Sequence, residues 1–243
     1  MGNRVLSRVV GEDLKLPVRR GPENRHYCGD TRYGFLMSES GFGDFEFERK
    51  FFVEELPAVA ASDPTPSLIV QAYLFAEDGY AVRVRLQGPA PAELDAPAGE
   101  LVDALGDGAY GTITTKGPAV GGTRYEAERE LDPLVAGQIV RRAPHIVTKI
   151  RYSMWLGEDG WVIDQFLGGN APLLLAEVER SGPVVDLAIP GFCTTEVSDD
   201  DRFRNEYLAH HPFGTWAEQY RRELSLLGPM FVRTLGHNHI GEA

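Results

Sequence analysis

Charged side chains at every second position are the feature of this sequence that points most directly to chemistry. In the segment DFEFERKFF, Glu46, Glu48 and Lys50 stand at every second position, and Phe45, Phe47 and Phe51 lie at the intervening parity. Side chains of a β-strand point alternately to its two faces, so the charges are predicted to share one face and the phenylalanines Phe45 and Phe47 the other. Carboxylates and amines gathered on one face could bind metal ions together with an anionic ligand.

The same alternation recurs in the segments YAVRVRL, YGTITTKG, RYEAEREL, IVTKIRYSM and LLLAEVER. These segments and the nearby VID add the basic residues Arg83, Arg85, Lys116, Lys149 and Arg151, and the acidic residues Glu126, Glu128, Asp164, Glu177 and Glu179. In a single strand such a pattern is typical of the solvated face of an antiparallel sheet. Its repetition favours an inverted arrangement, in which helices cover an apolar outside and the charges line a wet interior.

A wet interior that holds so many carboxylates needs cations. Carboxylates that crowd together in a partly desolvated space raise one another's pKa values, and bound cations relieve that repulsion. Because the acidic segments contain neither Cys nor clustered His, the oxygen ligands favour Mg²⁺ or Mn²⁺ over zinc. The interleaved lysines and arginines suit a polyanion, since a guanidinium can make forked contacts to phosphate.

The elements that must position these charges are short strands separated by Gly and Pro clusters, the spacing of an antiparallel barrel. Helices are predicted over 98–105, from an N-cap at Asp132 to before Pro144, and over 199–209. A further helix is predicted by an apolar stripe that begins at Phe213 and ends before Gly228. The helices are expected to pack on the apolar outer face of the barrel.

Length and composition restrict the classes of function. A chain of 243 residues can form one domain around a large barrel. The formal net charge of -12 argues against nucleic acid and against anionic membranes as partners. Only Cys28 and Cys193 are present, the first residues resemble no signal peptide, and no apolar run is long enough to cross a bilayer. A cytoplasmic protein is therefore expected, with a homodimer among the open options.

At Glu46-Phe47-Glu48-Arg49-Lys50 the chain shows an ExExK signature, and it resembles the CYTH superfamily, also called triphosphate tunnel metalloenzymes. The later motifs follow in family order: VRVR, TTK, RYEAE, TKIRY, VID, LLLAEVE and EVSDDDRFRNEYLA. The resemblance covers about residues 44–210. It implies an α+β, β-dominated fold with an antiparallel eight-stranded β-barrel tunnel. The expected organisation is an extension over 1–40, a tunnel domain over 41–212, and a C-terminal helix and tail over 213–243.

Carried over by position, the resemblance implies roles for individual residues. Glu46, Glu48, Glu177 and Glu179 are expected to bind metal, and Glu126, Glu128 and Asp164 match acidic positions that could serve a second ion. The residues expected to hold phosphates are Lys50, Arg83, Arg85, Lys116, Lys149, Arg151 and Arg204. Lys116 and Tyr73 are the residues expected to take part in catalysis. The chain departs from the family around Tyr73, where Val70-Gln71-Ala72 lacks a basic residue and a Gly that relatives often have, which leaves the choice of substrate open.

The function that the resemblance implies is metal-dependent hydrolysis of a triphosphate, with inorganic triphosphate as the expected substrate and pyrophosphate and phosphate as products. Alternatives are a class IV adenylate cyclase, a nucleoside or thiamine triphosphatase, and a noncatalytic protein that binds polyphosphate or a phosphorylated metabolite. Several other residues are not expected to act in catalysis. His237 and His239 lie near the end of the chain, while Trp155 and Trp161 flank a turn and are expected to be packing residues.

Overall fold

The computed structural model describes residues 45–92, 94, 96–120 and 123–241. The predicted extension over 1–40 lies outside the described residues, as does Cys28. No helix of the described ranges has the length and apolar character needed to span a membrane.

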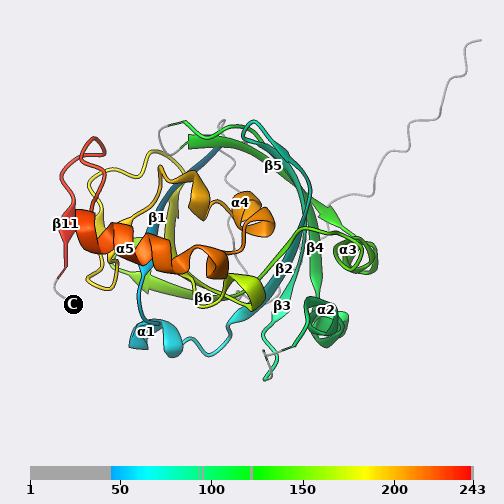
Figure 1. Cartoon of the computed structure of the whole chain (residues 1–243). Helices are drawn as coiled ribbons and strands as arrows, with labels where there is room; N and C mark the ends of the chain where they lie inside the picture. The colour runs from blue at the N-terminus through cyan, green and yellow to red at the C-terminus, as the bar shows by residue number, and fades with distance from the viewer. Residues whose placement is uncertain (1–44, 93, 95, 121–122, 242–243) are drawn as a thin grey trace, which may run out of the picture. The chain divides into compact units, whose positions relative to one another are not determined.

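The described chain is dominated by a closed antiparallel barrel of eight strands (Figure 1). The strands are β1 (Phe45–Val53), β2 (Ser67–Glu77), β3 (Tyr80–Pro89), β4 (Tyr110–Lys116), β5 (Thr123–Leu131), β6 (Ile146–Leu156), β7 (Asp159–Phe166) and β8 (Leu174–Arg180). Around the barrel they follow the order β1-β5-β4-β3-β2-β6-β7-β8, and β8 pairs back with β1. The predicted fold class is confirmed.

Two helices cover the outer face of the barrel, as the alternation predicts. Helices α2 (Ala98–Leu105) and α3 (Pro133–Val140) pack against Leu68 and Val70 of β2 and against Val84 of β3. The Asp132 carboxylate caps α3 by accepting a hydrogen bond from the Val135 N–H at 3.0 Å. Apolar residues of these strands therefore point outward, and the charged residues between them point into the barrel. A short helix, α1 (Ala58–Ala61), follows β1.

The C-terminal helices are shorter than the sequence predicts. Helix α4 spans Asn205–His210 and α5 spans Ala217–Leu227, each preceded by a 3₁₀ turn, over Asp201–Phe203 and Phe213–Thr215. The backbone is extended at Arg204 and leaves helical geometry again at Trp216. Each predicted helix is therefore divided into a 3₁₀ turn and a shorter α-helix.

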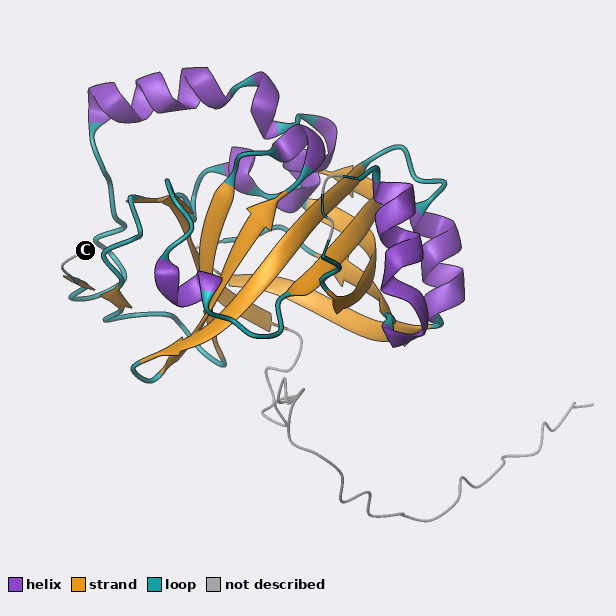
Figure 2. Ribbon diagram, turned by 90° about the horizontal axis from the view of Figure 1, so that it is seen from below, coloured by secondary structure: helices purple, strands orange, loops and turns teal. Residues whose placement is uncertain are grey.

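These helices do not pack on the outer wall of the barrel, contrary to the sequence-based prediction. They lie over one end of the barrel (Figures 1 and 2). There Phe203 and Tyr220 pack with Phe52 of β1, whose ring centroid is 5.1 Å from that of Tyr220. Phe52 lies on the same strand face as Glu48 and Lys50, so it points inward. The barrel interior is consequently apolar and covered at this end, which we call the closed end.

The last described residues, up to Ile240, pack on the outside of the barrel. Strand β11 (His239–Ile240) pairs in parallel with β9 (Ala188–Ile189), and β10 (Thr195–Glu196) pairs with the end of β1. Arg49 of β1 points outward and is 1% exposed, held by Glu196 and Asn238. The chain end with His237 and His239 is thus attached to the barrel wall.

Candidate functional site

The barrel interior brings together the acidic and basic residues that the sequence predicts, which come from every strand of the barrel except β2. On one side Lys50 Nζ lies 2.9 Å from Glu177 Oε1, a pairing that follows from the register in which these two residues stand opposite each other. Arg151 Nη2 lies 2.7 Å from Asp164 Oδ2 and 3.0 Å from Glu177 Oε2. Lys149, fully buried, pairs with the same carboxylate of Asp164.

A second group of ion pairs forms across β3, β4 and β5. Arg83 Nη2 donates to Thr114 Oγ1 at 2.9 Å and lies 3.1 Å from both Glu126 Oε1 and Glu128 Oε2. Lys116 Nζ lies 3.0 Å from Glu46 Oε2 and also contacts Glu126. Most of the predicted ligands for metal and for phosphate are therefore paired with one another.

Arg85 is the exception among the basic residues. Within the described part of the chain, no carboxylate forms an ion pair with it, and its Nε atom is buried without a hydrogen-bond partner. Burial, followed by repulsion from Arg83 and Arg151, lowers the pKa of Arg85 to about 10. A guanidinium in this state is suited to accept an anion, which would supply both a counter-charge and hydrogen-bond acceptors.

Glu48 and Glu179 are the corresponding exception among the carboxylates. They stand directly opposite each other on β1 and β8, and like charges in this position repel. Burial raises the pKa of Glu48 to about 7, because the opposing effect of Lys50, 3.5 Å away, is partly cancelled by Glu46 and Glu177. Burial and the neighbouring carboxylates also raise the pKa of Glu179. Negative charge is therefore incompletely neutralised between these two strands.

The carboxylates that are paired with lysines have pKa values shifted in the opposite direction. Although burial favours the neutral acid, Lys116 holds the pKa of Glu46 far below its usual value, and Lys50 does the same for Glu177. Lys149 is affected most by burial, which lowers its pKa to about 8 despite its contact with Asp164. The interior thus contains matched pairs, one excess cation at Arg85 and one excess pair of acids.

Glu48 and Glu179 fit a hard divalent cation by their donor chemistry. Both supply carboxylate oxygens, and their mutual repulsion is what a bound cation would relieve. In the described ranges, no three Cys, His, Asp or Glu side chains are already arranged as a metal-binding group. The ion pairs of Glu46 and Glu177 would have to open before these two residues could serve as further ligands.

One predicted site residue, Arg204, lies apart from this charged interior, and another, Tyr73, lies at its border with the closed end, opposite Arg83 in the strand register. Arg204 precedes α4, and its Nη2 lies 2.8 Å from Oδ1 of the exposed Asp201. Tyr73 is buried in the apolar cluster at the closed end, where its hydroxyl accepts a hydrogen bond from Gln71 Nε2 at 3.1 Å. Burial raises the pKa of Tyr73, so the hydroxyl stays protonated.

The structure adds residues to the interior that the sequence analysis did not single out. Arg124 Nη2 forms a buried ion pair with Glu206 Oε1 at 2.7 Å, and the same guanidinium donates to the carbonyl oxygens of Gly117 and Gly79. Arg124 shares a strand face with Glu126, which is a signal in the sequence. Glu206 comes from α4, and no local sequence pattern predicts that its side chain enters the barrel interior. Gln71 is also buried, with its Oε1 unpaired.

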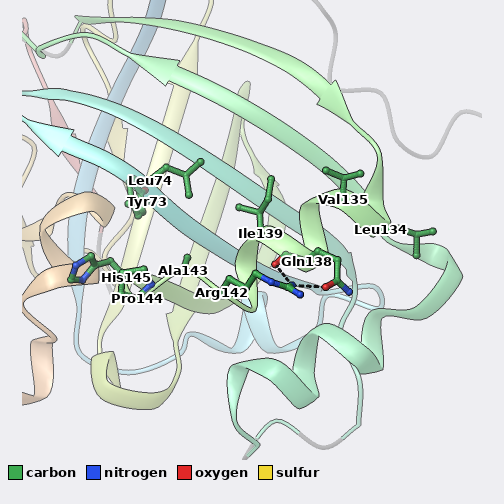
Figure 3. Close-up of a pocket in the computed structure, with 10 residues that line it drawn as sticks. All are labelled: Tyr73, Leu74, Leu134, Val135, Gln138, Ile139, Arg142, Ala143, Pro144 and His145. Atoms are coloured by element: carbon green, nitrogen blue, oxygen red, sulfur yellow. Dashed lines mark hydrogen bonds between the residues drawn. The ribbon is translucent and has the colours of Figure 1, made fainter.

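A separate groove lies between β2, α3 and the loop before β6 (Figure 3). Its walls are mostly apolar, with Leu74, Val135 and Ile139 among them, and Arg142 donates hydrogen bonds to Gln138 within the same wall. The groove contains no carboxylate. The charged interior is therefore the candidate site for chemistry.

The chain is similar in sequence to a curated protein from Acetivibrio thermocellus that is named an inorganic triphosphatase. The two are 27% identical over 180 residues, which cover 71% of this chain and 98% of the relative. No protein-family model matches the chain.

Among solved structures, the crystal structure of an inorganic triphosphatase is 25% identical and covers 68% of this chain and 93% of its own, with a TM-score of 0.44. A conserved hypothetical protein from Pyrococcus furiosus is 14% identical and covers 57% of this chain and 80% of its own, with a TM-score of 0.38.

Proposed function

We propose that this chain is a CYTH-like triphosphate tunnel protein and, on that premise, a metal-dependent triphosphatase. Its proposed reaction is the hydrolysis of inorganic triphosphate to pyrophosphate and phosphate. The relative from Acetivibrio thermocellus, which is named an inorganic triphosphatase, supports this choice of substrate.

The observation that carries the proposal is the unequal pairing of charges in the barrel. Arg85 forms no ion pair with any carboxylate of the described residues, while Glu48 and Glu179 face each other with too little positive charge between them. An anion alone would pair only with Arg85, and a cation alone would neutralise only Glu48 and Glu179. A polyphosphate that arrives with divalent cations satisfies both.

The chain's own residues then have defined tasks. Arg85, together with Arg83 and Arg151, would hold the phosphate oxygens, and Lys116 would contact the phosphate that is transferred. Water attacks the terminal phosphorus, a new P–O bond forms, and the phosphoanhydride bond breaks so that the bridging oxygen leaves with pyrophosphate. One proton of the water stays on the released phosphate and the other passes to solvent. Lys149, whose pKa is lowered to about 8 by burial, can donate a proton to that leaving group near neutral pH.

Glu48 and Glu179 are proposed to hold Mg²⁺ or Mn²⁺, with Glu46 and Glu177 as further ligands once their lysine partners turn to the phosphates. Glu126, Glu128 and Asp164 are proposed for a second ion. The cations would neutralise phosphate charge and lower the pKa of the attacking water.

A phosphate-release assay tests the proposal. Inorganic triphosphate, ATP and thiamine triphosphate are each offered with Mg²⁺ or Mn²⁺, and released phosphate and pyrophosphate are measured separately. We expect inorganic triphosphate to yield both products, and EDTA to abolish turnover. Full activity in a preparation shown to be free of metal would overturn the metal-dependent mechanism.

The same assay separates the alternatives. Release of pyrophosphate alone from ATP would indicate cyclisation, and tight binding without turnover would indicate a noncatalytic phosphate-binding protein. We further propose a cytoplasmic location, in keeping with a sequence that has only two cysteines, and no nucleic-acid partner, which the net charge of -12 supports.

A further inference from the structure

An exposed aromatic side chain extends the charged face of β6 beyond the described ion pairs. Along this strand Val147 lies at the closed end, Lys149 and Arg151 follow in the interior, and Ser153 and Trp155 come next. Exposure rises along this row, from 0% at Lys149 to 77% at Trp155. The row therefore leads out of the barrel at the end opposite α4 and α5, which we call the open end.

Trp155 is not the packing residue that its position beside a turn suggests. Tyr152, Met154 and Leu156, on the other face of β6, pack against the outer core together with Trp161, which is 1% exposed. The two tryptophans flank the same turn, yet they lie on opposite faces of the hairpin. Trp161 is a packing residue, as expected, whereas Trp155 is displayed on the face that carries Lys149 and Arg151.

Two contacts fix the position of Trp155, one with the facing strand of its hairpin and one through the neighbouring Ser153. Gly160 stands opposite Trp155 in the register, and a Cβ atom built on Gly160 would lie 3.8 Å from the indole ring. The indole thus lies across bare backbone with its other face free. Beside it, the Asp63 carboxylate accepts a hydrogen bond from the Ser153 N–H at 2.8 Å, which ties the projecting part of β6 to the loop before β2.

The spacing fits a ligand that has phosphates at one end and a flat ring at the other. Trp155 comes four positions after Arg151, which at about 3.3 Å per residue is about 13 Å along the strand. A sugar or other short spacer can bridge such a distance between a phosphate held by Arg151 and a ring stacked on the indole. Aromatic rings accept heteroaromatic rings by stacking, with little dependence on their identity.

We propose that Trp155 is a stacking platform for the heteroaromatic ring of an organic triphosphate, so that the barrel accepts such compounds besides inorganic triphosphate. The inference rests on the proposed function, because it needs the phosphates to bind in the interior. Two ring systems share this chemistry, a nucleobase and the rings of thiamine.

The test compares Trp155→Ala with the wild-type protein in the presence of Mg²⁺. We expect the Michaelis constant for ATP or thiamine triphosphate to rise about 5- to 150-fold, the range for loss of one ring stack. The constants for inorganic triphosphate should not change. Calorimetric titration with a nonhydrolysable ATP analogue should show the same loss of affinity, and Trp155→Phe should restore most of it.

A matched control is Tyr80→Ala, which removes another exposed aromatic side chain, at the start of β3 near the closed end. It should affect neither class of substrate. If wild type hydrolyses inorganic triphosphate but neither organic compound, or if Trp155→Ala hydrolyses and binds the organic compounds like wild type, the platform is wrong while the triphosphatase stands. Absence of turnover with every triphosphate would instead refute the proposed function.

Discussion

Two neighbouring residues of β1 form buried ion pairs on opposite sides of the barrel wall. Arg49 points outward and binds Glu196 with both Nε and Nη2, at 2.8 and 2.7 Å. Lys50 points inward and lies 2.9 Å from Glu177. Both pairs are almost fully removed from water, so burial and pairing alone do not tell a structural charge from a functional one.

The two ion pairs differ in how many of the charged and polar groups around them have a hydrogen-bond or ion-pair partner. Around the outer pair, Asn238 Oδ1 accepts from Arg49, while the Val232 N–H and the Ser198 hydroxyl both donate to Glu196. The inner pair belongs to a network that leaves Arg85 without an ion-pair partner among the described residues and places Glu48 opposite Glu179. The interior therefore differs from the outer wall in having buried charged groups without ion-pair partners, and a ligand could supply these partners.

The largest expected effect is on stability, at the outer pair. Glu196→Gln leaves the Arg49 guanidinium buried without a counter-charge, which typically costs about 3–5 kcal/mol in the free energy of unfolding. Urea unfolding measures that loss, and the activity of the molecules that remain folded should be unchanged. Asp201→Asn is the control, because it breaks an exposed pair with Arg204 worth about 0–1 kcal/mol. Equal losses in both variants would show that the outer network is not the stabilising one.

The next effect is on activity, at Arg85. Arg85→Met removes the excess cation, and kcat/KM for inorganic triphosphate should fall about 10²- to 10³-fold, the usual cost of one preorganised donor. The free energy of unfolding should stay level or rise, since a partly desolvated charge repelled by Arg83 and Arg151 disappears.

Arg180→Ala is the matched control for that variant. Arg180 lies on the outer face of β8, where it binds Asp159 at 2.7 and 2.8 Å. Its loss should leave kcat/KM close to the wild-type value. A fall as large as that of Arg85→Met would mean that the inward and outward faces of the strands are assigned wrongly.

Much of the barrel could be predicted from the sequence because a charge on every second residue fixes which face of a strand points inward. The start of α3 could be predicted for an equally local reason, the Asp132-Pro133 pair at its N-terminus. The closed end could not. Phe52 lies in the apolar run Phe51-Phe52-Val53, where alternation cannot be seen, and its partners Phe203 and Tyr220 are distant in the chain.

The sequence could predict which charged residues line the candidate site, but it could not predict which of them form ion pairs with one another. Which lysine meets which carboxylate depends on the stagger between strands, as for Lys116 with Glu46, and no local pattern encodes that stagger. Trp155 is a different case, because the sequence pattern already indicated which face of β6 carries it. It has the same parity along β6 as Lys149 and Arg151, whereas Trp161 has the opposite parity to Asp164 along β7.

The smallest expected effect is on the melting temperature of the metal-free protein, at Glu48. Glu48→Gln removes one of two facing carboxylates, so the melting temperature without metal should stay level or rise, by about 2–4 °C for each kcal/mol of repulsion relieved. The shift on adding Mg²⁺ or Mn²⁺ should shrink, because a ligand stabilises the folded state according to its concentration relative to its dissociation constant. Four melting curves, of wild type and variant with and without metal, measure both effects.

Glu46→Gln provides a comparison with the opposite sign. Lys116 neutralises Glu46 and holds its pKa far below the usual value, so losing that carboxylate should lower the melting temperature of the metal-free protein. The two neighbouring glutamates of one strand face should therefore move the melting temperature in different directions. If Glu48→Gln instead destabilised the metal-free protein as Glu46→Gln does, Glu48 would be a structural partner of Lys50, and its assignment as a metal ligand would have to be withdrawn.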